Sequence, residues 1–262
     1  DGIPMKKGDA NAIISTIHKL GKQEGYGKLF KDGVAAGAKE IGKGAEEYAL
    51  SVKGLELQPM EYRVMKPQAL ATATNTKDYI DSPCDVVYNW MLAPDASAKE
   101  EVEKFAEKVY GTRDAARPDK INATAPVVID YESKTVAVDM VGMCKYLIPM
   151  MFSHFLDIPA KLASFATGVE ISEADLMHAA QRVLTLERAI NVIKGMRRKD
   201  DTMPKRIFEE PVPSGPWKGE KLEKANFDKM LDEYYALHAY DKNGIPKEEA
   251  FKKFGLLEEW KV

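Results

Sequence analysis

The chain has 262 residues, of which 45% are hydrophobic and 30% charged, a composition typical of a globular protein with one large core or two smaller ones. The 38 basic residues are balanced by 41 acidic ones, so we expect neither a nucleic-acid surface nor a membrane surface. The two cysteines, Cys84 and Cys144, are too few for a disulfide framework and predict a reducing compartment, the cytoplasm.

The first half of the chain is predicted to be mostly helical. Apolar residues recur with the helical period over 9–21 and again over 26–41. Residues 53–59 predict a short extended piece. Residues 67–85 are rich in Thr, Asn, Asp and Pro, and we expect a loop long enough to carry a site. An amphipathic helix is predicted over 98–110.

The second half contains the only strong signal for β-structure. Two β-branched runs, 127–131 and 135–138, predict a small hairpin. Further along, Ser172 and Asp175 predict a capping box at the start of a helix that reaches about Gly195. The fold class predicted from these patterns is mainly α and multi-helical, in two lobes, with at most a small β-hairpin. The most apolar window is too short for a membrane span.

The segment after the predicted hairpin carries the clearest chemistry. Its six residues read D-M-V-G-M-C and include Asp139, Gly142, Met143 and Cys144. A carboxylate is a strong acceptor for the N–H groups of a ligand, a glycine lets backbone approach a ligand closely, and a thiolate binds metals. A lone cysteine after an apolar run is more often a buried core residue, so the pattern alone does not decide between the two.

Two further blocks are distinctive. Residues 188–206 form a charged stretch, for which the ordinary explanation is a helix dipole and surface ion pairs. Residues 231–246 form a stretch that contains several tyrosines. Together with 25–34, 46–56 and the Asp139 motif, these blocks resemble the tungsten-dependent aldehyde:ferredoxin oxidoreductase family, specifically its carboxy-terminal part, and they follow the family's order.

The resemblance implies a domain organisation. Residues 1–60 would end the middle helical domain, and residues 61–262 would form the carboxy-terminal helical domain. The amino-terminal domain that cradles the cofactor, together with the cysteine cluster ligands and the first pterin motif, would lie outside this chain. The chain begins at Asp1 without a methionine, and we expect a fragment or a processed subunit that is inactive alone.

The resemblance also assigns roles to the motif. Asp139 would contact a pterin, and Cys144 would be the fourth ligand of a 4Fe-4S cluster, since iron in such clusters is held by thiolates. Gly142 would allow close approach to the cofactor, and Met143 stands where the family usually has leucine. The implied cofactors are a tungsten held by two pterins and one 4Fe-4S cluster, both completed by residues outside this chain.

The predicted loop departs from the family. Where the family has an Arg-Gly-x-x-His pattern, Lys77 falls on the arginine and Asp81 on the histidine. We place Lys77 among the cofactor-binding residues. Asp81 would act as a proton carrier if it is desolvated, and otherwise it is a surface residue of a turn. Cys84 is not assigned as a ligand. The four histidines show no metal-binding spacing.

The activity implied is the oxidation of aldehydes to carboxylic acids, with electron transfer to ferredoxin or a similar iron–sulfur carrier. The implied partners are the amino-terminal part of the same enzyme and a small-molecule substrate, and a homodimer is compatible with these. The tungsten-bearing subunit of a benzoyl-CoA reductase is an alternative, favoured by Asp81 and by His238-Ala239-Tyr240, where aldehyde-oxidising members often have Gly-Trp. A non-catalytic helical scaffold subunit is an alternative of another class.

Overall fold

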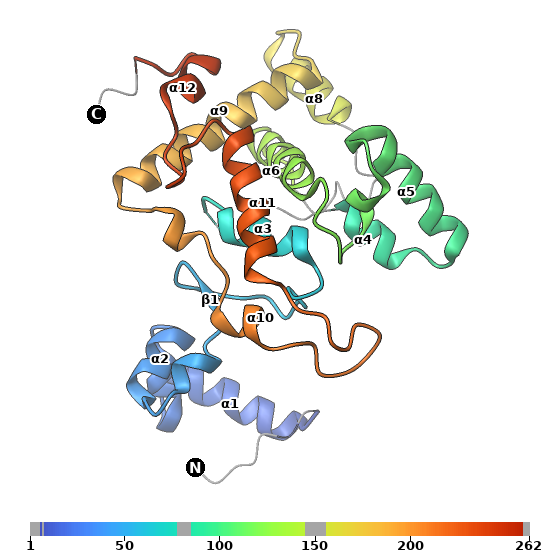
Figure 1. The fold of residues 1–262 in the computed structure, drawn as a ribbon. Coiled ribbons are helices and arrows are strands. Elements are labelled where there is room, and N and C mark those ends of the chain that lie inside the picture. The colour runs from blue at the N-terminus through green and yellow to red at the C-terminus, as the bar shows by residue number, and fades with distance from the viewer. Residues whose placement is uncertain (1–5, 7, 78–84, 145–155, 259–262) are drawn as a thin grey trace. The chain divides into compact units, whose positions relative to one another are not determined.

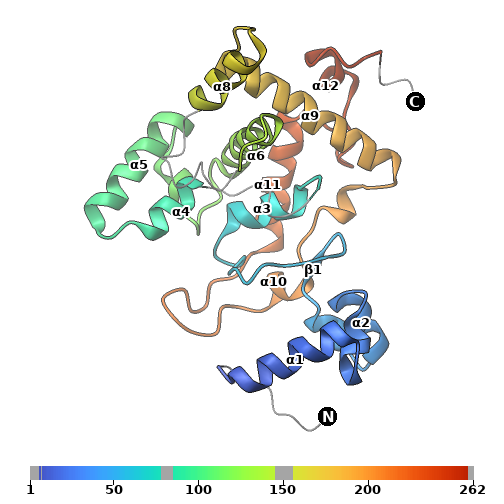
Figure 2. The ribbon, with the colours of Figure 1, turned by 180° about the vertical axis from the view of Figure 1, so that it is seen from behind.

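The computed structural model describes residues 6, 8–77, 85–144 and 156–258 (Figures 1 and 2). It divides into two compact units, Asp1–Pro59 with Pro204–Arg206, and Met60–Met203 with Ile207–Val262. Within the described ranges, a single two-stranded sheet accompanies the helices, so the prediction of a mainly α fold is confirmed. No helix in these ranges combines the length and the hydrophobicity that a membrane span requires.

The first unit begins with α1 (Ala10–Lys22), which is capped by the Asp9 carboxylate through the Ala12 N–H at 3.0 Å. The prediction of one helix over 26–41 is wrong, because Gly33, at a φ of +93°, separates two shorter helices. The Glu56 carboxylate accepts from the Val34 N–H at 2.7 Å at the start of the second of them. The two helices and their neighbour along the chain are η1 (Gly25–Phe30), α2 (Val34–Ile41) and η2 (Ala45–Tyr48).

The hairpin of this protein lies in the first unit. Strands β1 (Ser51–Val52) and β2 (Leu55–Glu56) pair antiparallel, with Val52 opposite Leu55. The two turn residues, Lys53 and Gly54, both have positive φ angles, of 52° and 84°. Two positive φ angles are what a two-residue turn needs to match the twist of its strands. The extended piece predicted over 53–59 is therefore the second half of a tight hairpin.

The second unit is built around α6 (Thr124–Met140), which packs against α3, α9 and α11. The two ribbon views show α6 between these helices (Figures 1 and 2). The remaining elements of this unit are α3 (Lys66–Thr74), α4 (Asp85–Leu92), α5 (Ala96–Tyr110), η4 (Arg113–Ala116), α8 (Asp157–Thr167), α9 (Glu173–Ile193), η5 (Arg198–Asp200), α11 (Lys224–Leu237) and α12 (Glu248–Lys253). The short helix α10 (Lys205–Glu209) spans the boundary between the units.

Two sequence predictions for this unit are wrong. Residues 127–138 form the middle of α6 and not a hairpin, and the region predicted as a loop from residue 67 contains α3. Both helices are buried almost all round, so they lack the apolar stripe by which a surface helix is recognised. In such surroundings tertiary packing overrides the strand preference of β-branched residues.

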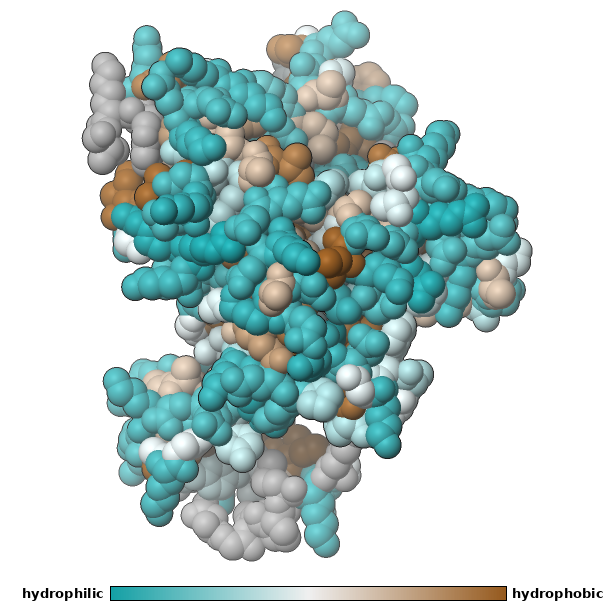
Figure 3. Space-filling view, in the orientation of Figure 1, coloured by the Kyte–Doolittle hydropathy of each residue, from teal (hydrophilic) through white to brown (hydrophobic). Residues whose placement is uncertain are grey.

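Helices with a clear polar face were predicted correctly. The helix expected over 98–110 is α5, which starts at an Asp95 cap. The capping box of Ser172 and Asp175 opens α9, as expected. In the space-filling view most of the visible surface is hydrophilic, and apolar side chains show among the hydrophilic ones over α8 (Figure 3).

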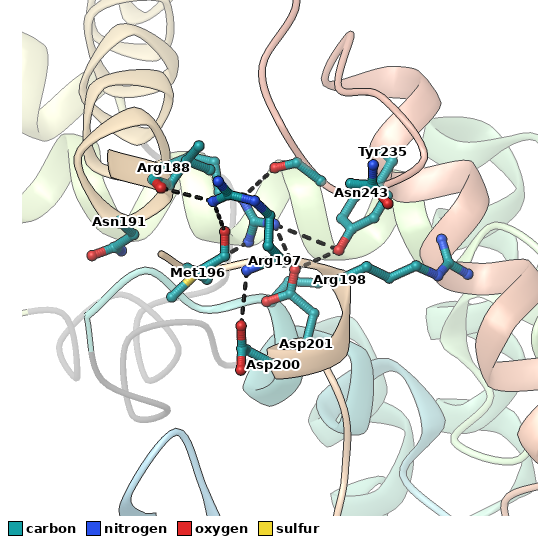
Figure 4. A network of polar contacts seen from close by, with 12 residues as sticks. Arg188, Asn191, Met196, Arg197, Arg198, Asp200, Asp201, Tyr235 and Asn243 are labelled. Carbon is teal, nitrogen blue, oxygen red and sulfur yellow. Dashed lines mark hydrogen bonds and ion pairs between the residues drawn. The ribbon is translucent and has the colours of Figure 1, made fainter. Parts of the chain in front are cut away.

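A buried ion pair ties the second unit together. Arg188 of α9, with 1% of its side chain exposed, lies with Nη2 2.7 Å from Oδ2 of Asp201. Its Nε donates to the Gly244 carbonyl at 2.8 Å, and the Tyr235 hydroxyl donates to Asp201 (Figure 4). Burial and the neighbouring Asp201 carboxylate raise the pKa of Tyr235, so its hydroxyl keeps its proton and remains a donor. One network therefore joins α9, α11, the end of η5 and the loop that holds Gly244.

The surface-pairing interpretation of the charged stretch holds for only part of it. Arg198 pairs with Asp232 at 2.6 Å, and the two side chains are 27% and 66% exposed. Arg188 and Asp201 are instead almost completely buried. The sequence does not separate these two pairs, because both arginines lie in the same basic stretch.

Gly244 is required by this network. Its φ is +76°, and a Cβ at this position would lie 2.1 Å from Nη2 of Arg188 and 2.7 Å from the Tyr235 hydroxyl. Gly168 has a similar φ of +73° but has no atom within 4 Å of such a Cβ. Alanine substitutions at the two glycines therefore separate the cost of backbone strain from the cost of displacing the ion pair.

We expect Gly244→Ala to lower the free energy of unfolding by about 3–5 kcal/mol, since a displaced Arg188 leaves buried charges uncompensated. Gly168→Ala should cost only about 1–2 kcal/mol, the strain of a left-handed alanine. Urea unfolding of the two variants and the unchanged chain measures both. Equal losses would show that Gly244 is needed for its backbone conformation alone.

Candidate functional site

The motif from Asp139 to Cys144 is the carboxyl end of α6. The Gly142 N–H donates to the Asp139 carbonyl at 3.0 Å, and the Met143 N–H donates to the Val138 carbonyl at 3.2 Å. With Gly142 at a φ of +73°, these two bonds form a Schellman motif, the commonest glycine-dependent way to end a helix. The spacing of Asp139 and Gly142 therefore has a structural reason, independent of any ligand.

The same helix end turns polar groups outward. Met143 packs against an apolar cluster that contains Val138, Leu156 and Ala160. Asp139, Gly142 and Cys144 are exposed, and no atom lies within 4 Å of a Cβ placed on Gly142. The interpretation of Cys144 as a buried core residue is therefore wrong. The motif presents a carboxylate and a thiol beside open space.

The start of the loop after α3 is fixed to α9. Lys77 forms an ion pair with Glu187 at 3.1 Å, and the Thr76 hydroxyl donates to the other oxygen of Glu187 at 2.6 Å. The Asn191 side-chain amide donates to the Thr76 carbonyl at 2.8 Å. Lys77 therefore already has a carboxylate partner. Asp81, the predicted proton carrier, lies outside the described residues, as does Cys84.

Helix α9 connects the two parts of the predicted site. Its residues Leu176, Ala180 and Leu184 pack in the apolar cluster that holds the last turns of α6. Glu187, less than one turn beyond Leu184, binds Lys77. Asp139, Gly142, Met143 and Cys144 thus lie together at the end of α6. Lys77, in the segment after α3, contacts the same supporting helix α9 through its ion pair with Glu187.

Among the buried polar atoms without a hydrogen-bond partner in the part of the chain that the structure describes, three lie on the helices before and after the loop that follows α3. They are Oε1 of Gln68, Oγ1 of Thr72 and Oδ1 of Asp85, in side chains that are 4%, 1% and 3% exposed. Gln68 and Thr72 lie one turn apart on α3, the helix before the loop, and Asp85 opens α4, the helix after it. A buried acceptor without a donor is costly, so these atoms are candidates for contact with a polar ligand.

Asp85 has an unusual environment for a carboxylate. Burial raises its pKa from 3.8 to about 7, and the positive charge of Lys134 on α6 offsets only part of this effect. The Lys134 ammonium lies 2.5 Å from Asp130, which also accepts from the Tyr110 hydroxyl at 2.6 Å. Sequence reasoning missed Asp85, because an aspartate that opens an apolar run is indistinguishable from an ordinary helix start.

A second buried cluster explains the unusual tail. Glu132, in the middle of α6, accepts from the Tyr234 hydroxyl at 3.0 Å, and its Oε1 lies 2.7 Å from Nε2 of His238. The His238 ring stacks on Tyr240 with centroids 5.0 Å apart. Burial, reinforced by the nearby Glu132 carboxylate, raises the pKa of Tyr234. The residues that stand in place of Gly-Trp therefore join α11 to α6 inside the second unit.

The sequence of nearly the whole chain matches a known family. Residues 1–256 match the family model described as aldehyde ferredoxin oxidoreductase, domains 2 and 3. The chain belongs to this family. Within the aldehyde ferredoxin oxidoreductases, it corresponds to the second and third domains, and the Asp139 motif falls inside the matched range.

Relatives in this family are similar over nearly the full chain. The chain is 28% identical over 262 residues to the tungsten-containing aldehyde ferredoxin oxidoreductase of Pyrococcus abyssi, which covers 97% of this chain and 38% of the relative. It is 26% identical over 271 residues to the aliphatic sulfonate oxidoreductase, WOR-like subunit, of Pyrococcus furiosus, with 98% and 36% covered. The chain therefore spans less than two fifths of the length of these relatives.

The fold is also found in a solved structure. The active site complex BamBC of benzoyl coenzyme A reductase, in complex with 1,5-dienoyl-CoA, superposes with a TM-score of 0.71 and 22% sequence identity. The match covers 98% of this chain and 40% of that chain. This similarity shows that the aldehyde ferredoxin oxidoreductase fold is shared.

The residues present fit the cofactors that the resemblance implies. A pterin edge carries N–H donors, and the end of α6 offers an exposed carboxylate and the open space at Gly142. An iron–sulfur cluster needs thiolates, and Cys144 offers one. Across the described ranges, no cluster of three or more His, Cys, Asp or Glu residues could hold a metal ion. The fit is therefore to one contact and one ligand of a larger site.

The raised pKa of Asp85 has a consequence for stability. Between the unfolded value of 3.8 and the folded value of about 7, the folded protein keeps a proton that the unfolded chain has lost. The free energy of unfolding should therefore fall as the pH rises through this window. Asp85→Asn removes the titration, and we expect this variant to be more stable by roughly 2–4 kcal/mol near pH 8, since each pKa unit corresponds to about 1.36 kcal/mol.

Urea unfolding at a series of pH values tests this expectation. The advantage of the Asn variant should shrink toward zero as the pH falls below the unfolded value of 3.8, where Asp85 is protonated in both the folded and the unfolded chain. A stability difference that does not change with pH would show that the Asp85 carboxyl has an ordinary pKa.

Proposed function

We propose that this chain is the carboxy-terminal part of a tungstopterin iron–sulfur oxidoreductase that converts aldehydes to carboxylic acids. The observation that carries the proposal is the end of α6, where an exposed carboxylate and an exposed thiol lie in a motif of the matched family. The partners we propose are the amino-terminal part of the enzyme and ferredoxin or a similar iron–sulfur carrier. We also propose a cytoplasmic location, because two cysteines are too few for a disulfide framework.

The residues of the helix end would divide the work. The Asp139 carboxylate would accept N–H groups of a pterin and fix its orientation, and Gly142 would leave room for it. Cys144 would supply one thiolate ligand to a 4Fe-4S cluster. When bound, the tungstopterin supplies the two-electron chemistry. Because Asp139 and Cys144 share one rigid helix end, the pterin contact and the cluster ligand would be held at a fixed separation.

The overall reaction determines how many protons and electrons the protein must remove from the site. An aldehyde and a water molecule give a carboxylic acid, two protons and two electrons, and the electrons leave through the iron–sulfur carrier. The protons need acceptor groups in the site. Asp81, in the loop that departs from the family pattern, is a candidate for this role. Lys77 would contact an anionic part of the cofactor while its ammonium also pairs with Glu187.

The ligand role of Cys144 has a matched test within the chain, because the chain has only one other cysteine. In the complete enzyme, Cys144→Ser should degrade the EPR signal of the reduced cluster and lower the iron content, since a hydroxyl replaces a thiolate ligand. Cys84→Ser should leave both unchanged. An unaltered spectrum in Cys144→Ser would refute the ligand assignment.

A second candidate function follows from the loop. Asp81 replaces the histidine of the aldehyde-oxidising pattern, and this replacement favours the tungsten-bearing subunit of a benzoyl-CoA reductase-type enzyme. Assays of the complete enzyme with aldehydes and with benzoyl-CoA distinguish the two candidates. We expect turnover of aldehydes with reduction of ferredoxin. Reduction of benzoyl-CoA alone would establish the alternative, and an enzyme without bound tungsten or iron would favour a scaffold subunit.

A further inference from the structure

Asp85 stands out among the buried polar groups of the second unit. It is 3% exposed, and its Oδ1 has no hydrogen-bond partner among the described residues. Most buried carboxylates are paired with a cation or accept several hydrogen bonds, because burial of an unpaired charge is costly. A buried carboxylate oxygen without such a partner is more typical of a functional site than of a structural one.

The charged groups around Asp85 do not neutralise it. Lys134 is the cation that acts on it, but the Lys134 ammonium is bound to Asp130. Helix α4 also packs against α5 and η4. The charges near these two elements pair with one another: Arg117, which follows η4, lies 3.9 Å from Glu103 and 3.4 Å from Asp119.

The position of Asp85 connects it to the motif. Asp85 begins α4, directly after the loop that departs from the family pattern. Its electrostatic neighbour Lys134 lies on α6, five residues before Asp139, and this separation corresponds to a rise of about 7.5 Å along the helix. The positive charge of Lys134 thus acts on Asp85 from the helix that ends in the cofactor motif.

We propose that Asp85 is a proton-transfer group of the site, in place of the predicted carrier Asp81. The proposal rests on the proposed oxidation of aldehydes, in which one water and one aldehyde yield a carboxylic acid, two protons and two electrons. The Asp85 carboxylate accepts one of these protons and later releases it to solvent, while the electrons pass to the iron–sulfur carrier. The second proton passes directly to solvent water, so both protons and both electrons are accounted for.

The acid strength of Asp85 suits this role. Its pKa of about 7 lies near neutral pH, where a group both accepts and releases protons readily. Lys134 tunes this value, since its positive charge favours the carboxylate. Activity that needs the carboxylate should therefore rise with pH through about 7, and removal of Lys134 should move that rise to higher pH.

The test uses the complete enzyme and its pH–rate profile. We expect Asp85→Asn to lower kcat for aldehyde oxidation by about 100-fold or more, the usual contribution of a general base, and to abolish the rise of activity near pH 7. Tungsten content, iron content and the cluster EPR signal should be unchanged. Lys134→Gln should keep a measurable rate but shift the rise upward in pH, a change that a purely structural role of Asp85 would not produce.

Matched variants make the outcome decisive. Asp232→Asn, at an exposed aspartate of the same unit, should retain most of the activity and the unshifted profile. Infrared difference spectra of unchanged enzyme against Asp85→Asn should contain a carboxyl band that titrates near pH 7, a readout independent of turnover. If Asp85→Asn keeps the rate and profile, or loses no more than Asp232→Asn does, the inference is wrong while the aldehyde oxidation stands. If the unchanged enzyme oxidises no aldehyde, the proposed function itself fails, and the role of Asp85 fails with it.

Discussion

The second unit depends on the buried ion pair between Arg188 and Asp201. Two charges removed from water need compensating partners. Here Asp201 is paired with Arg188 and accepts from the Tyr235 hydroxyl, and Nε of Arg188 donates to the Gly244 carbonyl. The pair therefore fixes α9 relative to α11. Because α9 also supports the last turns of α6 and holds Lys77 through Glu187, the predicted site inherits its geometry from this pair.

The predicted cofactor motif forms the C-terminal end of helix α6, and this structural role does not depend on a ligand. The Schellman bonds at Gly142 end α6, and the Met143 side chain anchors this end in the apolar cluster. The carboxylate of Asp139 and the thiol of Cys144 are left exposed on a rigid support. The helix end thus explains the glycine at position 142 and the anchoring of Met143, and it leaves the Asp139 and Cys144 side chains free for a ligand.

The sequence predicted what depends on local signals and missed what depends on tertiary surroundings. Capping residues such as Ser172 located α9 correctly. The buried helices α3 and α6 were missed, because burial on all sides removes the apolar periodicity and leaves β-branched residues such as Val127 as the only signal. Asp139 and Cys144 were found through the family pattern, but their exposure and the burial of Asp85 follow from packing that no single sequence reveals.

The central claim is that the end of α6 gives one ligand to a cluster and one contact to a pterin. A crystal structure of the complete enzyme, with iron and tungsten located by anomalous scattering, tests it most directly. The account predicts Cys144 Sγ bonded to an iron of the cluster and the Asp139 carboxylate within hydrogen-bond distance of a pterin N–H. A cluster whose four ligands all come from outside this chain would contradict it.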